Sequence, residues 1–323
     1  MRLRVTQVRV VSQLIISIQG KSILNYLQLR NKPAQFRSIT SLSVEDFDHL
    51  LPLFVGQWEY FITRYNLDGS PRNRSYTPRD PNTLATVEEK LFFILAYQKH
   101  ASVQAFFAAA FDLSQDMANK WIHILSPLLN AALKFYRPAR RAEDIPLVAN
   151  TEYIIDATER PVERDTYEQE EYYSGKQHQH TVKNLLLCSM VGLILYLSPT
   201  VYGKIHDKKL ADEKLTFSVP AKILADLGFI GYKPPFAIVL LPHKKPKNKE
   251  LTDVQKDENA TFNSRRVLVE NCIGSTKIMR CVKDKNRNRK FGYRDQIIET
   301  AVSLHNMKLT KRNERSATYS IAS

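Results

Sequence analysis

The 323-residue sequence is poor in cysteine and glycine and has no long apolar run. Its three cysteines (Cys188, Cys272 and Cys281) include no CxxC pair, which argues against a disulfide framework and a zinc knuckle. Ten glycines and 15 prolines are too few for a low-complexity or collagen-like chain. The best apolar stretch, residues 185–197, is shorter than the roughly 18 residues of a membrane span. We therefore expect a folded cytoplasmic protein with no membrane partner.

Two targeting or cofactor motifs are also missing. Residues 1–21 begin like a signal peptide, but Ser12, Gln13 and Ser17 interrupt the apolar stretch and no small-residue cleavage site follows. We expect no secretion, and we set residues 1–34 apart as an N-terminal extension of uncertain role. No GxxxxGK[ST] motif occurs, so we expect no nucleotide cofactor.

Positive charge is what the sequence has in excess. The formal net charge is +14, and residues 243–315 contain 19 lysines and arginines against nine acidic residues. A concentrated positive field attracts polyanions, and nucleic acid is the commonest polyanion for an intracellular protein. Charge alone also fits a solvated basic surface, so it indicates DNA or RNA without deciding between them.

Residues 35–140 are predicted to form a helical domain. Ser43 stands in the N-cap position of one helix, with Asp46 three residues later and Phe47 beginning an apolar face. A second, strongly apolar helix is predicted over 87–98, and the Gly- and Pro-containing stretch 66–81 reads as a loop. The spacing of five phenylalanines places them in the core: Phe92, Phe93, Phe106, Phe107 and Phe111.

A helix-turn-helix shape is predicted within this domain. Two short helices, over 103–111 and 115–125, are joined by a turn at 112–114. In such a unit the second helix faces the major groove, and its exposed side would carry Gln115, Asn119 and Lys120. An ordinary helical hairpin inside a bundle explains the same pattern equally well.

Residues 145–310 are predicted to form a mixed α/β domain, followed by a tail over 311–323. The β-rich runs begin near residues 151, 181 and 191, and two shorter ones lie near 222 and 237. Helices are expected over 207–219 and over about 251–279. The order of these elements predicts a sheet that carries polar residues at the ends of its strands.

Three acidic residues occur where an apolar core would reject them. Asp156 follows an apolar strand, Asp226 ends another, and Glu270 lies on a helix whose Val267 and Ile273 are expected to pack inward. A buried unpaired carboxylate costs several kcal/mol or takes up a proton. Convergence on divalent cations would relieve that cost, and Mg²⁺ selects hard oxygen ligands.

Several ordered segments resemble the motifs of DDE-type insertion-sequence transposases, which are DDE superfamily endonucleases, in the Harbinger-like branch. The resemblance spans roughly residues 35–310. The segments that carry it are 155–161 (IDATERP), 172–176 (YYSGK), 180–184 (HTVKN), 203–207 (GKIHD), 224–231 (LADLGFIG), 242–248 (PHKKPKN), 251–252 (LT), 265–270 (RRVLVE) and Lys277.

The resemblance implies an α/β RNase H-like catalytic core, a mixed sheet flanked by helices, preceded by an all-α helix-turn-helix domain. It implies Asp156, Asp226 and Glu270 as catalytic metal ligands for two Mg²⁺ ions, with Mn²⁺ as a substitute. The implied activity is metal-dependent cleavage and strand transfer of double-stranded DNA. The expected partners are terminal inverted repeats and target DNA, and a homo-oligomer assembled on DNA is expected in the nucleoid.

The same resemblance implies supporting and DNA-binding residues. Lys277 would meet DNA phosphate, and His206, Asp207 and Lys176 would support the site. Asp207 competes with Asp226 for the place of the second carboxylate. Further phosphate contacts are expected from basic residues that a solvated surface would also explain: Lys244, Lys245, Lys247, Arg265, Arg266 and the run 283–290.

Some alternatives stay open at this point. The pair His178 and His180 has HxH spacing but lacks zinc-spaced partners, so a hairpin surface near DNA is the favoured interpretation. Glu159, Arg160 and Glu163 are expected to form a polar network beside the first Asp. Besides an active transposase, the sequence fits a catalytically silent DNA-binding regulator of transposase ancestry. A structure-selective nuclease without joining activity is a third hypothesis.

Overall fold

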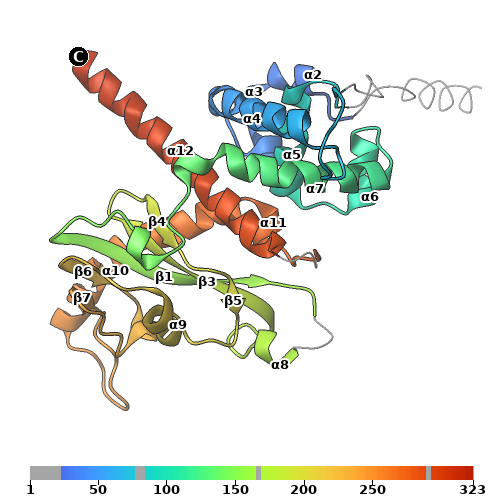
Figure 1. The fold of residues 1–323 in the computed structure, drawn as a ribbon. Helices are drawn as coiled ribbons and strands as arrows, with labels where there is room; N and C mark the ends of the chain where they lie inside the picture. The colour runs from blue at the N-terminus through green and yellow to red at the C-terminus, as the bar shows by residue number, and fades with distance from the viewer. Residues whose placement is uncertain (1–22, 77–83, 165–168, 289–291, 323) are drawn as a thin grey trace, which may run out of the picture. The chain divides into compact units, whose positions relative to one another are not determined.

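The computed structural model describes residues 23–76, 84–164, 169–288 and 292–322 (Figure 1). The chain forms two compact units, Met1–Leu129 and Asn130–Ser323. The predicted extension over 1–34 lies largely outside the described residues, as do the end of the predicted loop at 77–81 and part of the basic run 283–290. The boundaries 34/35, 140/145 and 310/311 stay predictions.

The first unit is helical throughout its described elements. They are α2 (Tyr26–Arg30), α3 (Pro33–Thr40), α4 (Val44–Arg64), α5 (Val87–His100), α6 (Gln104–Ala110) and α7 (Gln115–Ala132). Ser43 caps α4 as predicted, because its side chain accepts a hydrogen bond from the Asp46 amide at 3.1 Å. A complete capping box between Thr86 and Glu89 begins α5.

Aromatic rings form the core of the first unit. Phe36 packs against Phe47 and Phe92 with ring centres 5.2 and 5.7 Å apart. Phe107 and Phe111 are buried as predicted, but Phe106 is 74% exposed, so the prediction that it is a core residue was wrong. The reason is helical phase: α6 is a seven-residue helix that buries one side only.

Lys90 is the buried charge of this unit. Its Nζ lies 4.9 Å from the ring centre of Trp58 and 5.5 Å from that of Trp121. Burial lowers the pKa of this lysine to about 8. Its Nζ also donates to the carbonyl oxygens of Leu84, Ala85 and Thr86. The Lys90 amino group thus contacts both the segment before α5 and the two tryptophans.

The predicted helix-turn-helix shape is present as α6, a turn and α7. Ser114 caps α7 by accepting a hydrogen bond from the Met117 amide at 3.2 Å. The second helix runs to Ala132, past the predicted end at 125 and through Pro127. Gln115, Asn119 and Lys120 are all exposed on its first turns, as expected.

A seven-stranded mixed sheet forms the centre of the second unit. Its strands are β1 (Thr151–Pro161), β2 (Tyr173–Ser174), β3 (Gln179–Ser189), β4 (Ile194–Leu197), β5 (Val201–Tyr202), β6 (Ala221–Leu224) and β7 (Ala237–Leu240). The order is β2-β3-β1-β6-β7, with β4 and β5 also paired to β3. The pairs of β1 with β3 and of β3 with β4 are antiparallel, whereas β1, β6 and β7 run parallel. This arrangement confirms the predicted α/β, RNase H-like fold class.

Strand β1 continues well beyond its neighbour β6. The two strands pair only from Thr151 to Ile154, where β6 ends at Leu224. On the other side, β3 accompanies β1 from Tyr153 to Pro161. One edge of β1 is therefore open between the end of β6 and Pro161, whose carbonyl accepts a hydrogen bond from the Asn286 amide. Asp156 lies just past the point where that open edge begins.

Helices cover both faces of the sheet (Figure 1). One face packs against α9 (Asp207–Lys214) through a core that includes Ile155, Leu210 and Phe229. The other face is covered by α10 (Asp253–Lys277), α11 (Arg280–Lys283) and α12 (Tyr293–Ala322). Short elements complete the unit: η1 (Lys134–Tyr136), η2 (Ala142–Asp144), α8 (Gln169–Tyr172) and η3 (Leu227–Phe229).

The longest helix, α12, was not predicted. It crosses residue 311, where a tail was expected, and it buries Ile297, Ile298 and Val302 among other residues. In the parts of the chain that the structure describes, no helix combines the length and apolar character that crossing a membrane requires.

The two capping boxes give a test of the division into units. Thr86→Ala should lower the free energy of unfolding of the first unit by about 1 kcal/mol, because an N-cap hydrogen bond is lost. The measurement is urea unfolding followed by tryptophan fluorescence, since both tryptophans, Trp58 and Trp121, lie in this unit.

Thr252→Ala is the matched control, because Thr252 forms the capping box of α10 in the second unit. It should leave the fluorescence transition where it is. An equal shift in both variants would contradict independent unfolding of the two units.

Candidate active site

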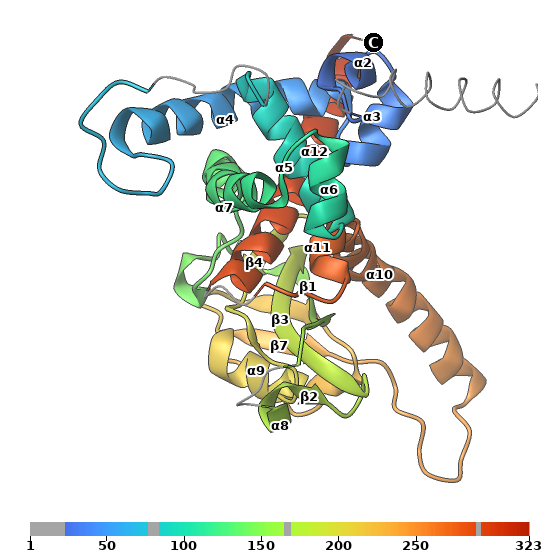
Figure 2. The same ribbon diagram turned by 90° about the vertical axis from the view of Figure 1, so that its right-hand side faces the viewer.

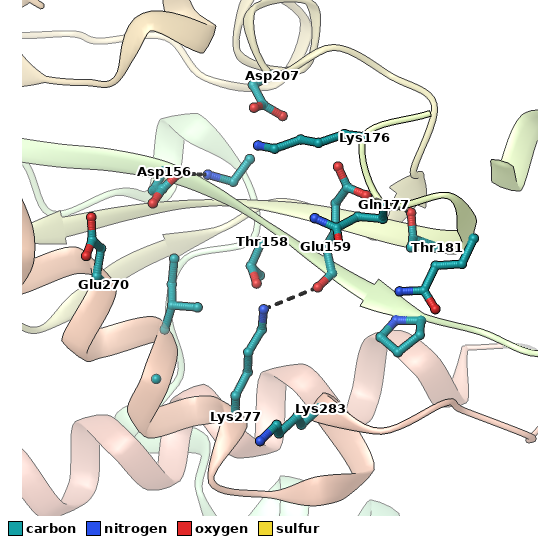
Figure 3. Close-up of a pocket in the computed structure, with 15 residues that line it drawn as sticks. Asp156, Thr158, Glu159, Lys176, Gln177, Thr181, Asp207, Glu270, Lys277 and Lys283 are labelled. Atoms are coloured by element: carbon teal, nitrogen blue, oxygen red, sulfur yellow. Dashed lines mark hydrogen bonds between the residues drawn. The ribbon is translucent and has the colours of Figure 1, made fainter. Parts of the chain in front are cut away.

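A pocket of about 520 Å³ opens beside the free edge of β1 (Figure 3). It is lined by Asp156, Ala157, Thr158, Glu159, Pro161, Lys176, Gln177, Gln179, Thr181, Asp207, Glu270, Ile273, Gly274, Lys277 and Lys283. Among the described residues, the lining therefore contains carboxylates and lysines but no aromatic ring. Two predicted metal ligands, Asp156 and Glu270, lie in it.

Asp156 is the most buried of the three predicted ligands. Its carboxylate accepts a hydrogen bond from the Ala157 amide at 2.8 Å and lies 3.6 Å from the Arg266 guanidinium. The pKa of Asp156 is raised to about 6, mainly by burial and to a smaller extent by the charges of Asp226 and Asp207, whereas the Ala157 hydrogen bond and Arg266 oppose the shift. The surroundings of Asp156 thus disfavour the ionised form of its carboxyl group.

Asp226 lies at the end of β6, one residue beyond the buried Ala225. Its side chain caps η3 by accepting a hydrogen bond from the Gly228 amide at 2.9 Å. A side chain at Gly228 would meet both Asp226 and Asp207, since a Cβ there would lie 3.0 and 3.2 Å from their oxygens. The two rival residues are therefore neighbours, and the structure brings both within electrostatic range of Asp156.

Glu270 is exposed on α10, which corrects the expectation that all three carboxylates are buried. The buried side of this helix consists of Arg266, Val269, Cys272 and Thr276. Val267 is 45% exposed, so the prediction that it packs inward was wrong by one position of helical phase. Glu270 instead lies beside that buried side, where it lines the pocket.

Lys183 is a functional candidate that the sequence analysis missed. Its Nζ contacts Asp207 at 2.8 Å and Glu159 at 3.3 Å and donates to the Ile205 carbonyl at 2.7 Å. The other Glu159 oxygen accepts from the Thr181 hydroxyl at 2.9 Å. The side chain of Lys183 is only 6% exposed. A lysine within the apolar run of β3 is the same signal that identified Asp156 in β1.

Arg160 does not belong to this network, contrary to the prediction. It is buried on the opposite face of β1 from Glu159, because successive residues of a strand alternate between faces. Its guanidinium donates to Asn184 at 2.8 Å, to Thr200 at 3.1 Å and to the Arg294 carbonyl at 2.9 Å. These contacts join β1, β3 and the start of α12, which is a structural role.

Lysines form another wall of the pocket. Lys277 points at β1 from α10, and its Nζ donates to the Glu159 carbonyl at 3.3 Å. Burial lowers the pKa of Lys277. Lys176 reaches toward Asp156 and Asp207 from the turn after β2, and Lys283 lies near Lys277 (Figure 3). Negative and positive side chains thus share one opening.

The structure separates the predicted DNA-binding arginines. Arg266 is 8% exposed and pairs with Asp156, so it faces the protein interior, unlike the phosphate contact that was expected. Arg265 pairs with Glu152. Its side chain remains 37% exposed.

The loop between β7 and α10 carries the remaining predicted lysines. Lys245 pairs with Glu250, whereas Lys244 and Lys247 are exposed. The loop is held to α10 by His243, which contacts Glu258 at 2.6 Å. Figure 2 shows the loop and the first turns of α10 extending away from the sheet.

The predicted histidines lie outside the pocket lining. His206 occupies the N-cap position of α9, directly before Asp207. His180 packs edge-on against Tyr173, with ring centres 5.9 Å apart. His178 has a left-handed φ of 51° in the turn between β2 and β3.

The donor chemistry of the site suits a hard divalent cation. Burial, with smaller contributions from the charges of Asp226 and Asp207, raises the pKa of Asp156 to about 6, and a bound cation would offset the cost of its buried charge. Within the described ranges, however, no group of three or more His, Cys, Asp or Glu side chains is gathered around one point. Arg266 supplies the compensating charge at Asp156 instead.

Comparisons with known proteins show which family and which relative the chain is similar to. Residues 155–306 match the family described as DDE superfamily endonuclease. The chain is similar to a protein of Microchaete diplosiphon described as "Probable transposase for insertion sequence element IS702". The two are 27% identical over 216 residues, which is 66% of this chain and 78% of the relative. No solved structure matches the chain.

The raised pKa of Asp156 is testable in the metal-free protein. Its folded-state pKa of about 6 exceeds the ordinary 3.8, so ionising it destabilises the fold as the pH rises between these values. Arg266→Met should move the titration to still higher pH, because a favourable positive charge is removed. Carboxyl-carbon NMR of aspartate-labelled protein measures the shift, and Asp156→Asn assigns the signal.

Arg265→Met is the matched control, because the adjacent Arg265 pairs with Glu152 rather than with Asp156. It should leave the Asp156 titration near pH 6. An unchanged titration in Arg266→Met would contradict the electrostatic role assigned to this arginine.

Proposed function

Because residues 155–306 belong to the DDE superfamily endonucleases, we propose that this chain is a DNA transposase. It binds the ends of a mobile element, cuts their strands and joins them to target DNA. The observation that carries the proposal is the pocket beside β1, where Asp156 and Glu270 face Lys277 in a single opening. Carboxylates suit hard cations and lysines suit phosphate, as strand cleavage requires.

Asp156, Asp226 and Glu270 are the residues proposed to hold the metal. Two Mg²⁺ ions, for which Mn²⁺ substitutes, would activate the nucleophile and stabilise the leaving 3′-oxygen when bound there. Asp226 is preferred to Asp207 because Lys183 already neutralises Asp207 at 2.8 Å. Asp207 then supports the site by shaping the turn around Gly228.

The cationic residues have three separate tasks in this proposal. Lys277 binds a phosphate from inside the pocket, and Lys176 does so from the opposite rim. Arg266 holds Asp156 in its charged form while no cation is bound. Lys183 holds two carboxylates, Glu159 and Asp207, in place in a buried position.

The remaining predicted contacts concern double-stranded DNA. Residues 35–140 would bind terminal inverted repeats through the exposed residues Gln115, Asn119 and Lys120. The loop lysines 244, 245 and 247, together with Arg265, would contact phosphates along the same duplex. Two element ends must meet, so a homo-oligomer is expected on DNA, in the nucleoid.

A catalytically silent DNA-binding protein is the second candidate. It is favoured by one observation: the three predicted ligands are not gathered around one point among the described residues. Such a protein would keep the DNA contacts and lack metal-dependent cleavage.

Strand cleavage separates the two candidates. The substrate is DNA carrying the native flanks of this gene, incubated with Mg²⁺ or Mn²⁺. Wild type should nick it at fixed positions. Asp156→Ala, Asp226→Asn and Glu270→Ala should each lower the rate by at least about a thousandfold while binding persists, because each removes a proposed metal ligand.

Asp212→Asn is the control, since Asp212 pairs with Lys208 on the exposed side of α9. It should cleave like wild type. Near-normal cleavage by Asp226→Asn together with inactive Asp207→Asn would reverse the assignment of the second carboxylate. Specific binding without cleavage by wild type would favour the silent protein.

The salt dependence of DNA binding tests the loop lysines. Replacing Lys244 and Lys247 by Gln should flatten the slope of log affinity against log salt by about two, since each lost phosphate contact removes about one. The measurement is a fluorescence-anisotropy titration between low and moderate salt. Lys256→Gln, in which the altered lysine pairs with Asp253 on α10, is the control and should change the slope less. An unchanged slope in the double variant would make the loop an ordinary solvated surface.

A further inference from the structure

Thr158 carries a buried hydroxyl that the described structure leaves without a partner. The residue is 3% exposed, lines the pocket, and its Oγ1 makes no hydrogen bond to any described residue. Other buried threonines differ. Thr181 donates to Glu159 at 2.9 Å, and Thr300 donates to the Gln296 carbonyl at 2.8 Å. Within the described ranges, Thr158 is the one buried hydroxyl side chain left unpaired.

An unpaired buried hydroxyl is unfavourable for the fold. Moving a hydroxyl from water into the protein without a hydrogen bond costs free energy, and valine would present nearly the same shape without that cost. The strand β1 also suits valine, because β-branched residues favour extended backbone. Stability of the free protein therefore gives no reason for the hydroxyl, which points to a ligand that enters the pocket.

The surroundings of Thr158 define the chemistry of that ligand. Thr158 lies on the same face of β1 as Asp156, two residues further along. Figure 3 shows its side chain pointing toward the amino group of Lys277, with Lys283 beyond. A hydroxyl donor beside the Lys277 ammonium suits an anionic oxygen. A cation would be repelled there by Lys277, and the lining residues that the structure describes include no aromatic ring on which a base could stack.

We propose that the Thr158 hydroxyl donates a hydrogen bond to a non-bridging oxygen of a DNA backbone phosphate held against Lys277. Hydroxyl and lysine side chains commonly share such contacts with phosphate. The contact sets the register of the strand relative to Asp156, about 6.6 Å away along β1. Thr158 is thus a substrate-positioning residue. This role depends on one part of the proposed function, namely that the protein binds DNA.

The test is an ethylation-interference footprint on duplex DNA with the native flanks of the gene. It reports which phosphates the bound protein contacts and does not depend on cleavage. In wild type, ethylation of a defined set of phosphates should prevent binding. Thr158→Val should lose one phosphate from that set. Thr158→Ser keeps the hydroxyl and should restore that position. Cleavage of the same DNA with Mn²⁺ should be slower by roughly 10- to 100-fold in Thr158→Val and close to wild type in Thr158→Ser.

Thermal unfolding of the same variants separates a ligand contact from a structural one. Thr158→Val should unfold at the wild-type temperature or above, because it breaks no internal hydrogen bond. Thr300→Val is the matched control in the same unit. It removes a hydroxyl that is bonded to Gln296 and to Asn130, so it should unfold earlier and keep the wild-type footprint.

The possible results distinguish this inference from the proposed function. An identical footprint and an unchanged cleavage rate in Thr158→Val would overturn the role of Thr158 while leaving the transposase proposal intact. A lost phosphate contact in a protein that never cleaves would keep the role of Thr158 and overturn the enzyme. A drop in unfolding temperature with an unchanged footprint would make the hydroxyl structural, and failure of wild type to bind DNA would overturn both.

Discussion

The difference in length between two neighbouring strands determines where this protein has a site. Strand β6 stops at Leu224, so β1 runs on from Asp156 to Arg160 with one edge free, until the Asn286 amide bonds to the Pro161 carbonyl. In a continuous sheet that edge would be closed by backbone pairing. Here its place is taken by side chains from β1, from α10 and from the turn after β2. The sheet that forms the core thus also leaves, beside the open edge of β1, a gap that polar side chains line.

Charge compensation is what makes the polar gap compatible with a stable fold. Asp156, Asp207 and Glu159 all have side chains less than one fifth exposed, and each lies near a cation, Arg266 or Lys183. Buried carboxylates without such partners would take up protons or destabilise the chain. The compensation is incomplete, as the raised pKa of Asp156 shows. Because burial is the main cause of that raised pKa, a bound cation would offset the cost of burying the carboxylate charge.

The sequence predicted the helices, the strands and the polar residues that interrupt apolar segments better than it predicted which side chains pair. Asp156 was recognisable because it interrupts an apolar strand, and the strands were recognisable by their runs of apolar residues. Its partner Arg266 was assigned to DNA, because a contact across 110 residues of chain leaves no local signal. The exposure of Glu270 depended on a helical phase that Val267 suggested wrongly.

The geometry of helix α10 restricts where residues can be inserted in the chain. Arg266, Glu270 and Lys277 lie within about 40° of one another around its axis, one and three turns apart. Inserting a single residue between Arg266 and Lys277 would rotate everything beyond it by about 100° and remove the lysine from the pocket. The loop at 241–252 contributes nothing to the pocket lining. Natural variants should therefore differ in length within the loop and keep the spacing from 266 to 277 constant.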